Sequence, residues 1–388
     1  MAQSAAMPLK PIELPANFDL LHLHAGDPDR YPFLLESVAT DRQGRHDDAF
    51  DILFAFPGDT LVLDNRFMLG GAGAPEDGND FLSALDAWWR RTAQARGEER
   101  LVPFHGGWFV FLGYELVHQI ESRIQLQEPM AGPVAFATRI PVALVRNRRS
   151  SRAWIVAEAT HGREAALLEA DIRACGLRRD VTSFSGVPAS GVTEPDPAAF
   201  LHAVDHIREL IARGDVYQVN LARRWTATVN AGLRPADIYQ RLRRTNPAPY
   251  AGIATLGGWS VISSSPERLV RSRDGRVDTR PIAGTRPTAD DPGGEEAMRC
   301  DLLANPKERA EHIMLIDLER NDLGRISEPG SIEVDEFMSV ESYAHVHHIV
   351  SNIRGRLRDG VSPGELIRAM FPGGTITGCP KVRCMEII

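Results

Sequence analysis

PAAFLHAVDHIRELIARGDVYQVNLARRWTATV, residues 197–229, joins the two patterns that decide the fold class. Apolar residues in its first half recur at helical spacing after Asp196, which predicts a capped helix. Apolar and polar residues then alternate, which predicts a strand over 216–229 with Gln218 and Asn220 on its polar face. This polar face could line a cavity or belong to a solvated edge strand, and the pattern does not decide between the two. Helices and strands mixed without strict βαβ alternation predict an α+β fold with large, mostly antiparallel sheets.

The first half of the chain also mixes strand patterns with short helices. Residues 50–64 predict a hairpin around a Pro-Gly pair, and 106–116 and 134–145 predict further strands. Residues 80–91 predict a helix.

A chain of 388 residues exceeds what one hydrophobic core usually supports, so two domains are expected. The Ser, Gly and Pro-rich segment 183–195 is the best linker in the sequence. We therefore expect an N-terminal domain at 1–182 and a catalytic domain at 196–388.

Charge and composition narrow the class of protein. The chain has 44 basic and 52 acidic residues, so its net charge is -8. It contains no run of basic residues of the kind that binds a phosphate backbone, which argues against a nucleic-acid partner. The first residues lack the layout of a signal peptide, and no apolar run approaches the roughly 18 residues that span a bilayer. A cytoplasmic enzyme with no membrane association and reduced thiols is the expectation.

NPKERAEHIMLIDLERND, residues 305–322, predicts a helix capped by Asn305. Glu308 and Glu311 are three apart, so their carboxylates share one face near the first turn and could hold a divalent ion. For Glu308 a capping box with Asn305 is an alternative. Two carboxylates suffice for Mg²⁺, because water and an oxygen-rich substrate complete its octahedron.

FPGGTITGCPKVRCMEII, residues 371–388, enters a helix through a glycine-rich loop. Exposed backbone N–H groups there would suit a carboxylate or phosphate, with Thr375, Thr377 and Lys381 as nearby donors. A helix end contributes only about 0.3–1 kcal/mol, so further donors or a metal must help to hold a small dianion.

Three other stretches carry polar residues that could serve a site. In SSSPER (263–268), Glu267 follows a strand and a proline, which places a carboxylate at a loop entrance. RPIAGTRP (280–287) is a stiff turn between two prolines. AHVHHIVS (344–351) alternates as a strand, with His345 and His347 on one face and His348 on the other. A strand histidine is usually just packed and hydrogen-bonded, so none of these decides the reaction.

Taken together, these segments resemble the chorismate-utilising enzymes, in particular component I of aminodeoxychorismate synthase and its relative, component I of anthranilate synthase. The resemblance rests on ordered matches along nearly the whole chain: YPFLLES, GGWFVFLGYEL, GDVYQVNLARR, NPAPYAG, SSSPERLV, RPIAGTRP, KERAEHIMLIDLERNDLGR, VESYAHVHHIVS and PGGTITGCPKVRCMEII. It implies two large antiparallel sheets packed as a sandwich with flanking helices. It also implies a Mg²⁺-dependent site for chorismate, and ammonia supplied by a glutamine amidotransferase partner.

The resemblance assigns expected roles residue by residue. Glu311 matches a Mg²⁺ ligand supported by Glu308, Glu267 matches the acid that protonates the departing hydroxyl, and His348 matches a histidine near the reacting ring. The matched substrate contacts are Gly284, Thr285 and Thr375, with Lys381 as a further donor. Gln218 replaces a lysine that activates water in isochorismate-forming relatives, which favours nitrogen as the nucleophile.

The resemblance leaves the reaction product open between two compounds. The motifs YQVNL, NPAPY, SPER and PGGTITG favour 4-amino-4-deoxychorismate, for p-aminobenzoate and folate synthesis. Many enzymes of that branch carry lysine at the position of Ala283, so this residue puts a covalent step in doubt and favours anthranilate, for tryptophan synthesis. Leu34, Leu35, Glu36 and Ser37 resemble the tryptophan-feedback element of the anthranilate branch, although an ordinary amphipathic helix start explains them too. Relatives continue for several dozen residues beyond position 388, so a non-catalytic fragment or binding subunit is a third hypothesis.

Overall fold

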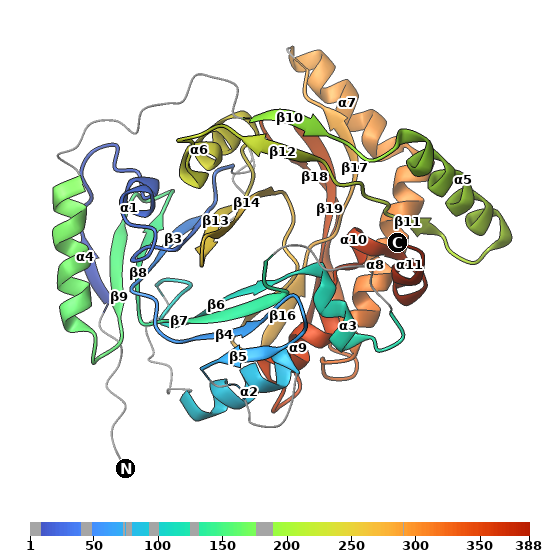
Figure 1. Cartoon of the computed structure of the whole chain (residues 1–388). Helices are drawn as coiled ribbons and strands as arrows, with labels where there is room; N and C mark the ends of the chain where they lie inside the picture. Colours follow the sequence, from blue (N-terminus) through green and yellow to red (C-terminus); the bar gives the residue numbers. More distant parts are fainter. Residues whose placement is uncertain are drawn as a thin grey trace.

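The computed structural model describes residues 9–39, 49–72, 74, 80–92, 101–124, 132–175, 189–289 and 291–388 (Figure 1). Helices and strands alternate irregularly, and every strand pairing among these residues is antiparallel. The predicted α+β class is confirmed. The described residues form three larger sheets, of seven, five and four strands, together with two strand pairs.

The seven-stranded sheet has the order β1 (Leu9–Ile12), β9 (Ala153–Ala157), β8 (Val142–Asn147), β3 (Phe50–Ala55), β2 (Phe33–Glu36), β13 (Tyr250–Leu256) and β14 (Trp259–Ser265). The four-stranded sheet has the order β5 (Leu69–Gly71), β4 (Thr60–Leu63), β7 (Ala135–Ile140) and β6 (Gly107–Leu112). The five-stranded sheet has the order β15 (Arg271–Arg273), β16 (Arg276–Thr279), β19 (Val346–Arg356) and β17 (Ile282–Pro287), with β18 (Glu333–Ser342) also on β19. The strand pairs are β10 (Ala189–Thr193) with β12 (Thr226–Val229), and β11 (Gln218–Val219) with β20 (Gly378–Cys379).

The helices are α1 (Leu21–Gly26), α2 (Phe81–Thr92), the 3₁₀ turn η1 (Tyr114–Leu116), α3 (Val117–Ile120), α4 (Gly162–Cys175), α5 (Pro197–Arg213), α6 (Pro235–Thr245), α7 (Pro292–Ala304), α8 (Pro306–Gly324), α9 (Pro363–Met370), α10 (Gly374–Thr377) and α11 (Lys381–Ile387). Helix α4 lies on the outer side of the seven-stranded sheet, and α5, α7 and α8 lie at the opposite side of the molecule (Figure 1). The caps predicted at Asp196 and Asn305 are present, since each side chain accepts a backbone N–H in the first turn.

The seven-stranded sheet combines both halves of the chain. Strand β2 pairs with β13, which brings Leu34 opposite Ile253. This sheet thus contains strands from both sides of the predicted linker. The division into two domains at that linker remains a prediction. Residues 183–188 of that linker lie outside the described residues, whereas 189–193 form β10.

Two strand predictions need correction. Residues 50–64 do contain two strands, but β3 joins the seven-stranded sheet and β4 the four-stranded sheet, so they do not form a hairpin. Residues 134–145 are not one strand, because the chain leaves β7 at Pro141 and enters β8 in the other sheet. Proline lacks the N–H that a continuous ladder requires. Local alternation could not reveal which sheet each strand joins.

An aromatic layer joins these two sheets. Phe33 of the seven-stranded sheet stacks on Phe109 of the four-stranded sheet, with ring centroids 4.0 Å apart. Phe54 meets Phe109 edge to face. Buried aromatic side chains contribute both apolar area and preferred ring geometry, so this layer fixes how the sheets pack.

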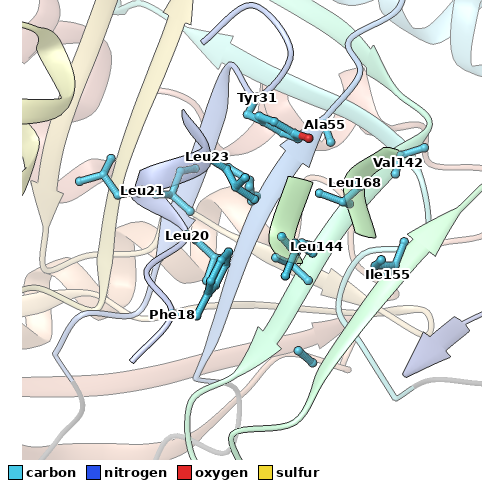
Figure 2. Close-up of a cluster of buried hydrophobic side chains, with 14 of the residues drawn as sticks. Phe18, Leu20, Leu21, Leu23, Tyr31, Ala55, Val142, Leu144, Ile155 and Leu168 are labelled. Atoms are coloured by element: carbon cyan, nitrogen blue, oxygen red, sulfur yellow. The ribbon is translucent and has the colours of Figure 1, made fainter. Parts of the chain in front are cut away.

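The largest apolar core lies on the other face of the seven-stranded sheet. Leu144 of β8 and Ile155 of β9 pack against Leu168 of α4, with leucines of α1 beside them (Figure 2). Leu144 and Leu168 are fully buried. Burying each such side chain contributes roughly 1.5–3 kcal/mol, which anchors the helices to the sheet.

The predicted strand at 216–229 is interrupted. Residues 218–219 pair with β20 and residues 226–229 pair with β10, and the intervening residues form no regular element. Gln218 thereby lies opposite Cys379, close to the glycine-rich loop. Gln218 and Asn220 are therefore held against the loop, whereas residues 222–229 are exposed.

Candidate active site

The turn predicted for RPIAGTRP is wrong, because residues Ile282–Pro287 form strand β17, which pairs with the histidine-bearing strand β19. Thr285 lies opposite His348, and the Thr285 hydroxyl is 3.0 Å from His348 Nδ1. The same nitrogen is 3.4 Å from the carbonyl oxygen of Gly284. Burial lowers the pKa of His348, although the hydrogen bond to Gly284 opposes the shift. His348 is therefore a neutral imidazole at neutral pH.

Gly284 occupies a bulge that only glycine fits. The register of β17 against β19 shifts between Ala283 and Thr285, and Gly284 has φ +68°. A Cβ atom at this position would lie 2.9 Å from Leu302 Cδ1 and 3.0 Å from Glu308 Oε2. The bulge therefore brings the β17 backbone against α7 and α8. Ala283 is buried beside it and pairs with Ile349.

Glu267 lies just beyond the end of β14 and is held from two directions. Its carboxylate accepts hydrogen bonds from the Thr375 hydroxyl and from the backbone N–H of Ile282. Burial nevertheless raises the pKa of Glu267 to about 7, because desolvation of the charged form outweighs both hydrogen bonds. A carboxyl group with this pKa can donate a proton at neutral pH.

The glycine-rich loop at 373–378 presents Thr375 to this carboxylate. Asn220 Nδ2 donates to the Thr375 carbonyl oxygen at 2.5 Å, and Gln218 Nε2 lies 3.4 Å from Asn220 Oδ1. The Thr377 hydroxyl bonds within the loop to Gly373 and Gly374 carbonyls and is fully buried. Thr375, Asn220 and Gln218 therefore form one side of the site.

Glu308 and Glu311 lie near the start of α8, as the sequence predicts. The Asn305 side chain accepts from the N–H groups of Lys307 and Glu308. Glu308 itself lies 3.3 Å from an Arg286 nitrogen, so its carboxylate faces β17. Glu311 is half-buried one turn further along.

The donor set suits Mg²⁺ only in part. Mg²⁺ binds oxygen ligands such as the carboxylates of Glu308 and Glu311, and it needs only one or two carboxylates from the protein. Within the described ranges, no group of three or more metal-ligating side chains is gathered. Mg²⁺ binding at Glu308 and Glu311, with water and substrate completing the shell, therefore stays a prediction.

Lys381 does not point freely into the site. Its ammonium group pairs with Asp322 at 2.6 Å and donates to the Pro372 carbonyl oxygen at 3.0 Å. Only 8% of Lys381 is exposed. Its predicted substrate contact remains a prediction, and the observed contacts tie α11 to α8 and to the loop.

The other two strand histidines have different surroundings. His347 is fully buried, with Nδ1 2.8 Å from the Ser342 hydroxyl and Nε2 2.6 Å from a Glu295 carboxylate oxygen. His345 is exposed. Among the described residues, the His348 side chain is within hydrogen-bonding distance of Thr285 and Gly284.

The segment Leu34–Ser37 lies on and just after strand β2, so a helix start there is wrong. Leu34 is fully buried and Leu35 is exposed. Glu36 accepts from Arg148 at 3.0 Å and Arg243 at 2.8 Å. Burial raises the pKa of Glu36, while both arginines oppose the shift. Tryptophan binding at this segment stays a prediction.

Sequence reasoning did not single out Glu319 and Asp322, and it noted Asn220 only as polar. Glu319 and Asp322 are both buried on α8, where Glu319 accepts the Gly374 N–H at 3.2 Å. Helical spacing could have found them, because steps of three and four residues lead from Glu311 through 315 to 319 and 322. They lie on the same buried face.

Residues 72–388 match the sequence model of the chorismate binding enzyme family. The chain belongs to this family. It is 38% identical over 321 residues to "Aminodeoxychorismate synthase component 1" of Bacillus subtilis, covering 80% of this chain and 67% of that protein. It is 39% identical over 330 residues to "Anthranilate synthase component 1" of Streptomyces coelicolor, covering 80% and 64%. The chain thus spans about two thirds of the length of these family members.

Two solved structures share the fold. Anthranilate synthase component I from Streptococcus pneumoniae aligns with a TM-score of 0.74 and 29% identity, covering 88% of this chain and 77% of that one. The menaquinone-specific isochorismate synthase MenF of Escherichia coli aligns with a TM-score of 0.66 but only 16% identity, covering 99% and 79%. None of the helices in the described part of the chain is both long and apolar enough to cross a membrane.

Proposed function

We propose that this chain carries out the reaction of aminodeoxychorismate synthase component I, the replacement of the ring hydroxyl of chorismate by ammonia to form 4-amino-4-deoxychorismate. The observation that carries the proposal is the partly buried Glu267 carboxyl group, whose pKa is raised by burial to about 7 and which is hydrogen-bonded to Thr375. A proton donor of this kind is what loss of the hydroxyl requires.

Hydroxide is a poor leaving group, so the C–O bond breaks readily only when the oxygen gains a proton. Glu267 in its protonated form donates that proton, and the hydroxyl leaves as water. The ammonia nitrogen forms the new C–N bond and gives up a proton, which can return to Glu267. One chorismate and one ammonia therefore yield one aminated product and one water.

Chorismate carries two carboxylates, which require donors. Thr285 on β17 is exposed and Thr375 on α10 is partly buried, and each carries a hydroxyl that can donate. Neutral His348 is held by Thr285 and Gly284, so it can donate or accept one hydrogen bond without adding charge.

Glu308 and Glu311 would hold Mg²⁺. When bound, this ion supplies Lewis-acid polarisation and neutralises a ring carboxylate. Arg286 forms an ion pair with Glu308.

Anthranilate formation is the second candidate, because Ala283 stands where many aminodeoxychorismate synthases carry lysine. Ala283 is 6% exposed, so a longer side chain there would have to leave the packed face of β17. The two relatives of this chain at 38% and 39% identity belong to different branches and do not separate the products.

Product identification tests the proposal. The protein is incubated with chorismate, Mg²⁺ and ammonium, with and without the downstream lyase. We expect p-aminobenzoate only when the lyase is added. Fluorescent anthranilate in its absence would overturn the choice of product. No turnover by this chain, with turnover in a version extended to the length of its relatives, would favour the third hypothesis of an inactive fragment.

Glutamine as nitrogen source tests the proposed partner. We expect ammonium alone to support turnover, and glutamine to support it only when a glutamine amidotransferase subunit is added. Turnover with glutamine by the isolated chain would contradict the proposed division of labour.

A further inference from the structure

A second carboxyl group is buried beside the glycine-rich loop. Glu319 of α8 is 3% exposed, and its Oε1 accepts the backbone N–H of Gly374 at 3.2 Å. Its Oε2 has no hydrogen-bond partner among the residues that the structure describes. A buried carboxyl oxygen without a partner is costly, so its position calls for a physical reason.

The loop connects this group to the proposed proton donor. Gly374 bonds Glu319, and the next residue, Thr375, bonds Glu267. Consecutive Cα atoms are about 3.8 Å apart, so the two carboxyl groups are bridged by a single dipeptide. Asn220 holds the Thr375 carbonyl from the opposite side.

Packing makes this bridge rigid. A Cβ atom on Gly374 would collide with the Leu318 side chain and would lie 3.2 Å from Glu319 Oε1. The loop backbone therefore rests directly on α8 at this point. Glu319 contacts Gly374, and one peptide unit joins Gly374 to Thr375. A change in the Glu319 side chain is therefore expected to move Thr375.

The charges around Glu319 are mostly negative. Asp322 lies on the same helix and Glu267 lies across the loop, and both disfavour ionisation of Glu319. Lys381 is the opposing cation, but it is already paired with Asp322 at 2.6 Å. Burial, followed by the charge of Asp322, raises the pKa of Glu319 to about 7. Glu267 and Glu319 therefore both titrate near pH 7, and the charge of Glu267 raises the pKa of Glu319 less than burial and Asp322 do.

We propose that Glu319 is a positioning residue for the proton donor: through Gly374 it holds Thr375 against Glu267, and its negative charge keeps the Glu267 carboxyl group protonated. This inference rests on the proposed function for its catalytic consequence. The arrangement itself is a property of the fold. When two carboxyl groups repel each other, one of them keeps its proton to higher pH than it would alone.

Two substitutions separate the two parts of the proposal. Glu319→Gln retains an oxygen that can accept from Gly374 and removes the charge. Glu319→Leu removes both. Asp317→Asn, at an exposed carboxylate of the same helix that pairs with Arg320, is the matched control.

The activity readout is the ratio of each variant to the wild type as a function of pH, at saturating ammonium. For Glu319→Gln we expect kcat within about threefold of the wild type near pH 6 and a loss of about tenfold near pH 8, because Glu267 ionises earlier. For Glu319→Leu we expect kcat to fall at least about tenfold at both pH values, with KM changed less, because Thr375 is no longer held. Glu319→Gln with the wild-type pH profile would overturn the charge role. Glu319→Leu with wild-type kcat would overturn the positioning role.

A second readout does not depend on activity. A protonated carboxyl group gives an infrared C=O band. The band that disappears in Glu267→Gln belongs to Glu267 and reports whether Glu267 is protonated. We expect Glu319→Gln to move the titration of this band to lower pH by about one unit. An unmoved titration would overturn the charge role even if the protein aminates chorismate. A shifted titration in a protein that makes no product would support it while the proposed function fails. If Glu319→Leu does not fold, Glu319→Gln and this titration still decide the charge role, and rescue of folding by glutamine supports the contact to Gly374.

Discussion

The Thr285 hydroxyl lies 3.0 Å from Nδ1 of His348, although the two residues are 63 positions apart in the sequence. The pairing of β17 with β19 makes this contact, because Thr285 and His348 are direct partners in the register. It fixes one ring nitrogen of a histidine whose pKa is lowered by burial. This contact sets the orientation of the imidazole ring.

Replacing the hydroxyl tests this orientation. We expect Thr285→Val to lower kcat by about tenfold, because the imidazole loses the bond that orients it. Its melting temperature should stay near that of the wild type, since Thr285 is exposed. Thr288→Val is the control, because the Thr288 hydroxyl bonds only weakly to the Ala344 carbonyl, at 3.4 Å. Equal kcat values for the two variants would count against a role for the contact.

Gly284→Ala should damage both stability and activity. The position has φ +68°, and the new Cβ would press on Leu302 and Glu308. We expect a loss of unfolding free energy of about 2–4 kcal/mol, from backbone strain and overpacking together. Gly275→Ala is the matched control, with φ +72° and nothing within 4 Å of its Cβ. It should cost only about 1–2 kcal/mol. Denaturant unfolding of both variants measures the difference, and equal losses would contradict the packing argument.

Glu267→Gln removes the proposed proton donor, and we expect kcat to fall by about 10²–10⁴-fold. A flat pH response together with full activity in this variant would remove Glu267 from the mechanism. A conservative amide keeps the shape of the side chain. Loss of activity in a variant that still folds would therefore show that the reaction needs the Glu267 proton.

The same variant should change how stability depends on pH. Burial raises the pKa of Glu267 from 4.5 to about 7 in the folded chain, so the folded protein binds this proton more tightly than the unfolded chain. The resulting stabilisation is complete below the unfolded pKa and is lost as the pH rises through the folded one. We expect the wild type to lose more unfolding free energy than Glu267→Gln between about pH 5 and about pH 8. Parallel curves from urea titrations at the two pH values would show that Glu267 does not contribute.

Glu311→Gln should weaken the proposed Mg²⁺ dependence. We expect the Mg²⁺ concentration for half-maximal activity to rise by at least about tenfold, and that of Glu308→Gln to rise less, because Arg286 already engages Glu308. Asp317→Asn, which changes an exposed carboxylate on the same helix, should leave the Mg²⁺ titration unchanged. Unaltered Mg²⁺ dependence and turnover in Glu311→Gln would reject the assigned ligand.

A distant carboxylate should matter for stability and not for chemistry. Asp86 of α2 is buried and accepts from the Ser362 hydroxyl and from the Gly364 N–H at 2.7 Å, so it caps α9 from outside. We expect Asp86→Ala to cost about 2–4 kcal/mol, because two buried donors lose a charged acceptor. Asp359→Ala, at an exposed position before α9, should cost less than about 0.5 kcal/mol. Thermal unfolding compares them, and equal melting temperatures would refute the capping role.

Local patterns alone determined the α+β class, the helices after Asp196 and Asn305, and the strand that carries His348. These features depend on periodicity and on capping between neighbours in the chain, both of which are readable in one dimension. The ordered motifs were also sufficient to indicate the family. Component I of aminodeoxychorismate synthase, as the specific member, stays a proposal.

Tertiary structure alone decided which strands share a sheet and which carboxylates lose their water. Residues 50–64 read as one hairpin, yet β3 and β4 belong to different sheets, because sheet membership depends on partners far along the chain. Glu267 and Glu319 are ordinary carboxylic acids in the sequence. Only their burial around Gly374 and Thr375 raises their pKa values toward neutrality, because desolvation is set by all the elements that pack around a group.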